Sequence, residues 1–254
     1  MQTLKGRTCV FAGATAGDGT ASVKALCAGG MNVVMATHNI KGAEALISAV
    51  KLAGLPGKCS ALSAEGKIPP EQQSETYRKV AEEFGSVDVI ICNTGDNGRI
   101  CSIDDLSGED LLKDVDHLVG TSYKMLRAAL PALRQSKAPR VIFMSSVEGC
   151  RGGKLEGLAN AIGKGAVRAL TLNAAARLAP EGITVNCVSK GAITRMEPQK
   201  EGAPDPEAML PFIPLARLGT PEDLAESICF LASEESAYIT GQILELNGGM
   251  NLGR

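Results

Sequence analysis

Residues 7–28, RTCVFAGATAGDGTASVKALCA, decide the fold. The segment opens at residues 7–12 with a short run rich in apolar and β-branched residues, which predicts a buried strand. A turn containing Gly13, Gly17 and Gly19 follows, and residues 19–28 then predict a helix. In this order, a glycine-rich turn brings backbone N–H groups and a helix N-terminus toward a phosphate. The segment therefore predicts the first unit of an α/β fold with a nucleotide crevice.

The same alternation of strand and helix continues to the end of the chain. Strands are predicted at residues 7–12, 32–36, 58–62, 87–92, 141–145, 184–188 and 243–246. Helices are predicted at residues 19–28, 41–53, 70–84, 108–135, 158–178 and 221–233. Nearly continuous apolar strands between helices are typical of a parallel sheet covered on both faces. We predict one domain over residues 1–254, an α/β, doubly wound, mostly parallel, seven-stranded Rossmann-type sheet, with its crevice at the carboxyl ends of the strands.

Composition excludes several classes of protein. The 254 residues carry 26 Lys and Arg against 28 Asp and Glu, and no basic stripe predicts nucleic acid or anionic lipid as a partner. Aromatic residues make up only 3%, which argues against base stacking. Without a signal segment or a membrane-length apolar run, we expect a cytoplasmic protein with no membrane partner. The eight cysteines include no C-x-x-C pair, so we expect reduced, mostly buried thiols and no metal site.

The spacing of the glycine-rich turn, G-x-x-x-G-x-G, resembles the fingerprint of the short-chain dehydrogenase/reductase family. The residues that this resemblance assigns to cofactor binding are Gly13, Thr15, Gly17, Asp18 and Gly19. The family usually has Thr and an apolar residue where this chain has Ala12 and Asp18. A carboxylate here would repel a pyrophosphate by a few kcal/mol at ~4 Å. Alternatively, Asp18 caps the helix.

A second segment, residues 144–167, follows the fifth predicted strand and carries Ser146, Asn160 and Lys164. The last two lie one helical turn apart. The layout resembles the family's active site, a Ser followed by Tyr-x-x-x-Lys, with Asn160 at the Tyr position. The resemblance implies that the Ser hydrogen-bonds a carbonyl oxygen, the Tyr exchanges its proton, and the Lys lowers the Tyr pKa and holds the nicotinamide ribose. Ser146, Asn160 and Lys164 are therefore the candidate catalytic residues, and Lys164 is also assigned to the cofactor.

An amide at position 160 changes the expected chemistry. Asn160 can donate a hydrogen bond to a carbonyl oxygen, but it cannot give up a proton near pH 7. Losing a positioned general acid typically costs about 10²–10⁴-fold in rate. Lys164 or Lys190 could supply the proton through a water, His117 could feed a relay, or the substrate could bring its own acidic group. Alternatively, the amide only holds the Ser146 loop.

Residues after the second predicted strand bear on the choice of nucleotide. Thr37, His38 and Asn39 stand where an acidic residue would bind the ribose of NAD. Thr37 and His38 resemble a weakened form of the Ser/Thr-Arg pair of family members that use NADP. We therefore expect NADP rather than NAD, with these three residues in the cofactor site, although His38 could equally be a plain surface residue.

Residues after other strands complete the predicted cofactor site. Asn93 and Gly95 lie in a segment that resembles the family's Asn-Asn-Ala-Gly, and Glu65 lies near its adenine-contacting Asp. The family's helical Asn, which anchors a proton-relay water, aligns with His117 or Leu118. A partly buried, structural role is the expected one for His117.

Where the family has Pro-Gly beside the nicotinamide, this chain has Lys190 and Gly191, followed by Ile193. These three residues are also assigned to the cofactor, and Lys190 either reaches an anion or points to solvent. Residues 193–214 are polar and aperiodic, which suits a substrate lid. The C-terminal segment resembles the family end that packs between subunits, so the resemblance implies a homotetramer or homodimer.

The function that these patterns favour is an NAD(P)-dependent oxidoreductase that interconverts a carbonyl and an alcohol of a small-molecule substrate, with an altered proton donor. Two alternatives stay open. The chain could be a non-redox lyase or isomerase that uses Ser146, Asn160 and Lys164 as an oxyanion-type site. It could also bind the cofactor without dehydrogenase activity. Likeness of fold does not decide among them, because function depends on the site.

Overall fold

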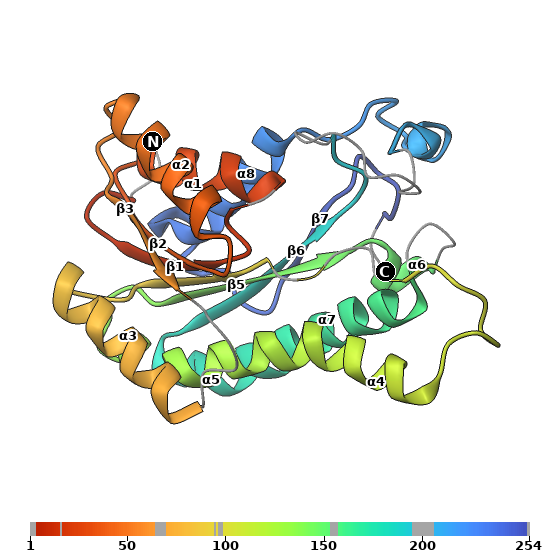
Figure 1. The fold of residues 1–254 in the computed structure, drawn as a ribbon, viewed down its shortest axis with the longest axis horizontal. Coiled ribbons are helices and arrows are strands. Elements are labelled where there is room, and N and C mark those ends of the chain that lie inside the picture. The colour runs from red at the N-terminus through yellow and green to blue at the C-terminus, as the bar shows by residue number, and fades with distance from the viewer. Residues whose placement is uncertain are drawn as a thin grey trace.

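The computed structural model describes residues 4–15, 17–63, 70–93, 95, 99–152, 157–194 and 206–252. Within these ranges the chain forms a seven-stranded sheet in the order β3-β2-β1-β4-β5-β6-β7, and every pairing is parallel (Figure 1). The strands are β1 (Thr8–Ala12), β2 (Asn32–Thr37), β3 (Cys59–Ser63), β4 (Val89–Cys92), β5 (Arg140–Ser146), β6 (Thr184–Lys190) and β7 (Ile243–Leu246). The strand order reverses between β1 and β4, which places the ligand crevice of a doubly wound sheet there. The predicted fold class is confirmed.

Helices cover both faces of this sheet (Figure 1). One layer contains α1 (Asp18–Ala28), α2 (Ile40–Leu52) and α8 (Pro221–Ala232). The other contains α3 (Pro70–Phe84), α4 (Gly108–Val115), α5 (Thr121–Leu133) and α7 (Leu158–Leu178), and a short helix, α6 (Glu148–Arg151), follows β5. Alternate residues of each strand enter the two cores: Cys9 and Phe11 of β1 pack toward α1, whereas Val10 packs toward α5 and α7. Two apolar layers therefore hold the sheet in place.

The predicted helix at residues 108–135 is divided in the structure. A π-helical turn, Asp116–Gly120, separates α4 from α5. Such a turn holds one residue more than a regular helical turn, and it often lies at a functional site. The three helical segments follow one another without a gap, which is why the sequence predicted one uninterrupted helix.

Strands β5 and β6 are longer than predicted. Both Ser146 and Lys190, expected just beyond their strands, are the last residues of β5 and β6 and lie opposite each other in register. Neighbouring parallel strands are about 4.8 Å apart, so the two residues start from adjacent positions at the same edge of the sheet.

The predicted lid, residues 193–214, falls partly outside the described residues. Within the described part, Ile193 forms a bridge with Gly219, and Pro206–Phe212 is a 3₁₀ helix in which Met209 is buried. The lid therefore stays a prediction, and Glu65 also lies outside the described residues. Among those that are described, no helix is long and apolar enough to cross a membrane, and no cluster of His, Cys, Asp and Glu suits a metal ion.

Candidate active site

The glycine-rich turn and the end of β4 are in direct contact. Gly13 follows β1 with a positive φ of 81°, and the Asn93 backbone N–H donates to the Ala12 carbonyl at 2.9 Å. A Cβ atom at Gly13 would collide with the Asn93 carbonyl oxygen. Position 13 therefore requires glycine, both because of its backbone conformation and because the backbone of Asn93 lies so close.

This contact predicts a difference between two glycines of the same turn. Gly13→Ala should destabilise the protein by about 3 kcal/mol or more, because the strained φ and the backbone collision add. Gly17→Ala is the matched control: φ there is 54°, but nothing lies within 4 Å of an added Cβ, so only the cost of about 1–3 kcal/mol for the strained backbone conformation is expected. Urea unfolding of both variants measures the difference, and equal losses would contradict the collision.

Asp18, Asn93 and Lys190 form one polar cluster at the ends of three segments distant in sequence. The Lys190 ammonium lies 2.7 Å from Asp18 Oδ2 and donates to Asn93 Oδ1 at 3.4 Å, while Asn93 Nδ2 donates to Asp18 Oδ1 at 3.0 Å. The Asp18 and Lys190 side chains are only 16% and 24% exposed. Burial raises the pKa of Asp18, but the charge of Lys190 and the hydrogen bonds from Lys190 and Asn93 outweigh it and lower the pKa below its usual value.

This cluster corrects two expectations. Asp18 does not cap α1: it is the first helical residue, Gly17 is the N-cap, and within the described chain no side chain caps that end. Lys190 does not simply point to solvent, because it is paired with Asp18; its assignment to the cofactor stays a prediction. The pair is neutral overall, so Lys190 offsets the repulsion that Asp18 alone would exert on a pyrophosphate. A neutral cluster beside an uncapped helix N-terminus is compatible with a bound anion.

The residues after β2 are divided between interior and surface. Thr37 is buried, and its hydroxyl lies 3.0 Å from the Thr15 hydroxyl of the glycine-rich turn. The same Thr37 oxygen accepts from the Asn39 backbone N–H, and the Asn39 side chain caps α2 by accepting from Gly42 N–H, both at 3.0 Å. His38 is exposed. Thr37 therefore joins the two loops and Asn39 has a structural role, while both His38 and Asn39 are exposed to solvent.

All three candidate catalytic residues are buried. Ser146 is 7% exposed, Asn160 3% and Lys164 6%. Lys164 Nζ donates to the Met144 carbonyl at 3.3 Å, and the Ser145 hydroxyl donates to the Lys164 carbonyl at 2.9 Å. These contacts fix α7 against β5. A Cβ atom built on Gly95 would lie 3.6 Å from Lys164 Nζ, so the ammonium lies between the carboxyl ends of β4 and β5.

The π-helical turn presents Leu118, not His117, to this site. Leu118 is 4% exposed, and a Cβ atom on either Gly95 or Gly163 would collide with its side chain. His117 is exposed, so the expectation of a partly buried His117 was wrong. Consecutive helical residues point in different directions, so the uncertainty of one residue in matching the family pattern left open which of His117 and Leu118 faces the site.

Sequence reasoning did not select Glu148, the first residue of α6. Its side chain is buried, at 6% exposed, and its backbone N–H donates to the Ser146 hydroxyl at 3.2 Å. The available signal was its place two residues after Ser146. A carboxyl group is thus buried beside the candidate serine, where its desolvation is costly unless it is hydrogen-bonded.

Comparisons with known proteins agree with this fold. A family described as Enoyl-(Acyl carrier protein) reductase matches residues 13–251. Two curated relatives are both named 3-oxoacyl-[acyl-carrier-protein] reductase FabG. The protein from Rickettsia conorii is 30% identical over 98% of this chain and 99% of the relative. The one from Vibrio harveyi is 32% identical over 97% and 98%.

Solved structures give the same result. A double mutant of a Serratia marcescens short-chain dehydrogenase/reductase superposes with a TM-score of 0.84 at 26% identity, over 98% of this chain and 99% of that one. The protein gox2181, at 22% identity and a TM-score of 0.85 over 98% and 97%, shares the fold. The fold and these matches define a Rossmann-type protein of an oxidoreductase family. The chain belongs to the short-chain dehydrogenase/reductase family.

Proposed function

We propose that this protein is an NAD(P)(H)-dependent oxidoreductase that interconverts a carbonyl and an alcohol, and that Lys164 supplies the proton that tyrosine supplies in the family pattern. The observation that carries the proposal is the position of Lys164 Nζ, buried between the ends of β4 and β5 and hydrogen-bonded to Met144. Lysine and tyrosine side chains have similar acidity in water. Asn160 carries no proton that it can release near neutral pH.

The residues present fit a dinucleotide. The close backbone contact at Gly13 and the uncapped N-terminus of α1 suit a pyrophosphate. The pairing of Asp18 with Lys190 neutralises the negative charge of Asp18. We assign Gly13, Thr15, Gly17 and Gly19 to the binding of this pyrophosphate. NADP remains the preferred nucleotide, with His38 as the exposed group nearest in sequence to Thr37. When bound, the nicotinamide would give or take the hydride.

The protein's own residues then have separate tasks. The Ser146 hydroxyl and the Asn160 amide would hold the carbonyl oxygen by donating hydrogen bonds, and this orients the substrate. Lys164 would pass its proton to that oxygen through a water during reduction and recover it during oxidation. Charge that develops on the oxygen would also be stabilised by the Lys164 ammonium in this buried setting.

Turnover tests the proposal directly. The protein should oxidise NADPH or NADH in the presence of a carbonyl panel that includes 3-oxoacyl thioesters, the substrate class in the names of its relatives. Calorimetry with all four nucleotides measures binding separately. Binding without turnover across the panel would favour a cofactor-binding protein, and product formation without change in nicotinamide absorbance would favour a lyase or isomerase. The cytoplasmic location, the single domain and the homotetramer or homodimer remain predictions.

Lys190→Met tests the role of the cluster in nucleotide binding. Removal of the ammonium leaves the largely buried Asp18 carboxylate without its charged partner beside the pyrophosphate, so we expect the Kd for NADPH to rise about tenfold or more. The matched control is the double variant Asp18→Asn, Lys190→Met, which removes both charges and should return the Kd to within a few-fold of the parent. An unchanged Kd in the single variant would show that Lys190 does not offset Asp18.

A further inference from the structure

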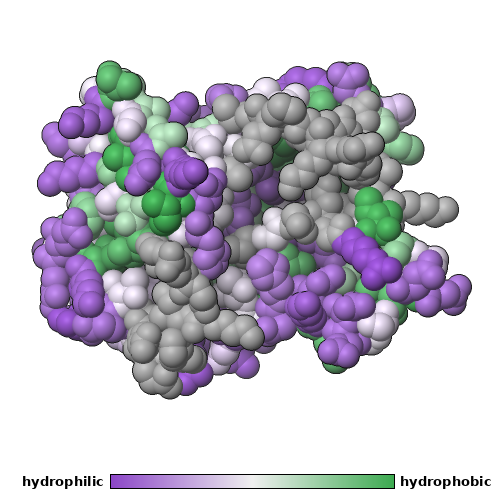
Figure 2. All heavy atoms as spheres, viewed as in Figure 1, coloured by the Kyte–Doolittle hydropathy of each residue, from purple (hydrophilic) through white to green (hydrophobic). Residues whose placement is uncertain are grey.

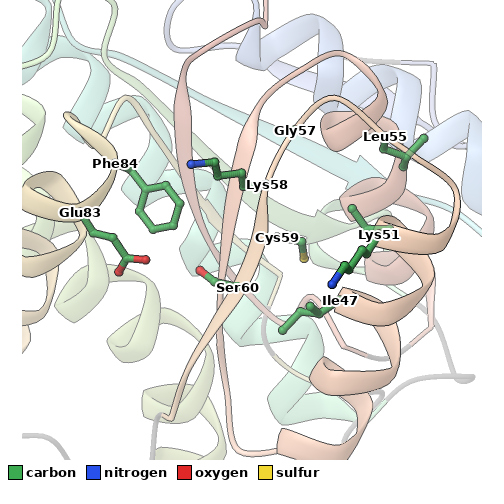
Figure 3. A pocket seen from close by; sticks show the side chains of 10 residues that line it. Ile47, Lys51, Leu55, Gly57, Lys58, Cys59, Ser60, Glu83 and Phe84 are labelled. Atoms are coloured by element: carbon green, nitrogen blue, oxygen red, sulfur yellow. The ribbon is translucent and has the colours of Figure 1, made fainter.

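A cavity of about 450 Å³ opens at the edge of the sheet, away from the candidate active site (Figure 3). It lies between α2, the beginning of β3 and the end of α3, and its apolar lining includes Ile47, Leu55 and Phe84. Figure 2 shows hydrophobic side chains that reach the surface over this part of the molecule. Because the cavity adjoins the first residues of β3, it lies at the amino ends of the strands. The cofactor crevice is at their carboxyl ends.

Cys59, the first residue of β3, forms part of the cavity wall and is half-buried. Behind it lies Cys27, in the last turn of α1 and completely buried. The Cys27 carbonyl accepts from the Gly57 backbone N–H at 2.9 Å, and Cys27 Sγ lies 3.8 Å from the Lys58 carbonyl oxygen. These contacts hold the end of α1 against the segment that enters β3.

The two thiols interact, and their environments differ. Interaction with the Cys27 thiol lowers the pKa of Cys59, although partial burial acts in the opposite direction. The same interaction, together with burial, raises the pKa of Cys27. Cys59 is therefore the thiol that ionises first, and Cys27 is the thiol that keeps its proton, which it donates to the Lys58 carbonyl oxygen at 3.8 Å. Ionised, accessible sulfur is the reactive form of cysteine.

We propose that Cys59 is a peroxide-reactive thiol at this cavity and that Cys27 resolves its oxidised form into a Cys27–Cys59 disulfide. The Cys59 sulfur attacks one oxygen of hydrogen peroxide, the O–O bond breaks, and the departing hydroxide takes a proton to form water. The Cys27 sulfur then attacks the sulfenic sulfur, the S–O bond breaks, and the second hydroxide leaves as water with the Cys27 proton. Two thiols lose two electrons in total, and the peroxide is reduced to two waters.

The surroundings favour this pair over the other cysteines. Lys51 and Lys58 also line the cavity. Figure 3 shows the Cys59 side chain between the side chains of Ser60 and Lys51. The other free thiols offer a contrast: Cys9, Cys92, Cys187 and Cys229 are buried, Cys101 is half-buried but does not line this cavity, and burial raises the pKa of the exposed Cys150 thiol.

Alkylation measures the first step. Limiting iodoacetamide at pH 7, followed by peptide mapping, should modify Cys59 about tenfold faster than the more exposed Cys150. Cys27→Ala should slow the labelling of Cys59, whereas Cys150→Ser should leave it unchanged. Equal or slower labelling of Cys59 than of Cys150 in the parent protein would overturn the proposal.

Peroxide treatment measures the second step. A Cys27–Cys59 linked peptide should form under non-reducing conditions, with the loss of two hydrogen atoms in mass, and dithiothreitol should reverse it. In Cys27→Ala, a dimedone adduct should form on Cys59 in place of the disulfide. If peroxide treatment of the parent protein yields no linked Cys27–Cys59 peptide, the proposal is overturned, whether or not the variants fold.

Discussion

Asn160→Tyr should raise the turnover number for carbonyl reduction by about 10²-fold or more. The substitution places a phenol, which can release a proton, one helical turn from the Lys164 ammonium and on the same buried helix face. A positioned general acid typically contributes about 10²–10⁴-fold. Steady-state kinetics with the best substrate of the carbonyl panel measure the change, and the gain should appear in kcat because the new proton is used only in the transition state.

Asn160→Phe is the matched control for this gain. It adds a ring of the same size at a position that is only 3% exposed, so any loss from crowding is shared by the two variants. The hydroxyl is the single difference between them. If both variants have the same kcat, a proton donor at position 160 does not speed the rate-limiting step, and the expected gain is contradicted.

Local patterns predicted the fold well because each unit carries its own signals. The strand, glycine turn and helix of residues 7–28 are all visible within one segment, and the structure confirms them as β1 and α1. The exceptions were also local in origin. A π-helical turn adds one residue without ending the helix, so the sequence showed no gap at Asp116–Gly120.

The candidate site depends on contacts that no local pattern carries. Asp18 and Lys190 are separated by 172 positions in sequence, and only the sheet order brings the ends of β1, β4 and β6 together. The sequence showed each as an isolated departure from the family, one acidic and one basic. The structure shows one compensating pair. The signal that could have predicted this pair was that two residues of opposite charge depart from the family pattern at the ends of strands that are expected to converge.

An ambiguity of one residue in the alignment limited the prediction for the helix after β4. His117 and Leu118 both fitted the family's helical Asn, and a shift of one residue rotates a helical side chain by about 100°. Only the three-dimensional structure could place Leu118 against Gly95 and Gly163. His117 is consequently a weak candidate for a proton relay, which leaves Lys164 as the better-placed donor among the routes considered.

Lys164→Met should lower kcat by about 10²–10⁴-fold, because it removes the proposed proton donor and the positive charge at the carbonyl oxygen. The loss alone does not separate a proton donor from a residue that only binds the nucleotide. Lys164→Arg makes that separation. Arginine keeps the charge and several hydrogen-bond donors, but it does not release a proton at physiological pH. NADPH binding should therefore stay within a few-fold of the parent, while kcat falls about 10²-fold.

The decisive comparison places Lys164→Arg in the Asn160→Tyr background. The phenol can then supply the proton, so the arginine substitution should cost much less in kcat than it does beside Asn160. Coupling of this kind is expected when two residues perform the same step, and the double-mutant cycle measures it. If Lys164→Arg costs the same factor in both backgrounds, Lys164 acts through binding or charge alone, and the proton reaches the carbonyl oxygen by another route.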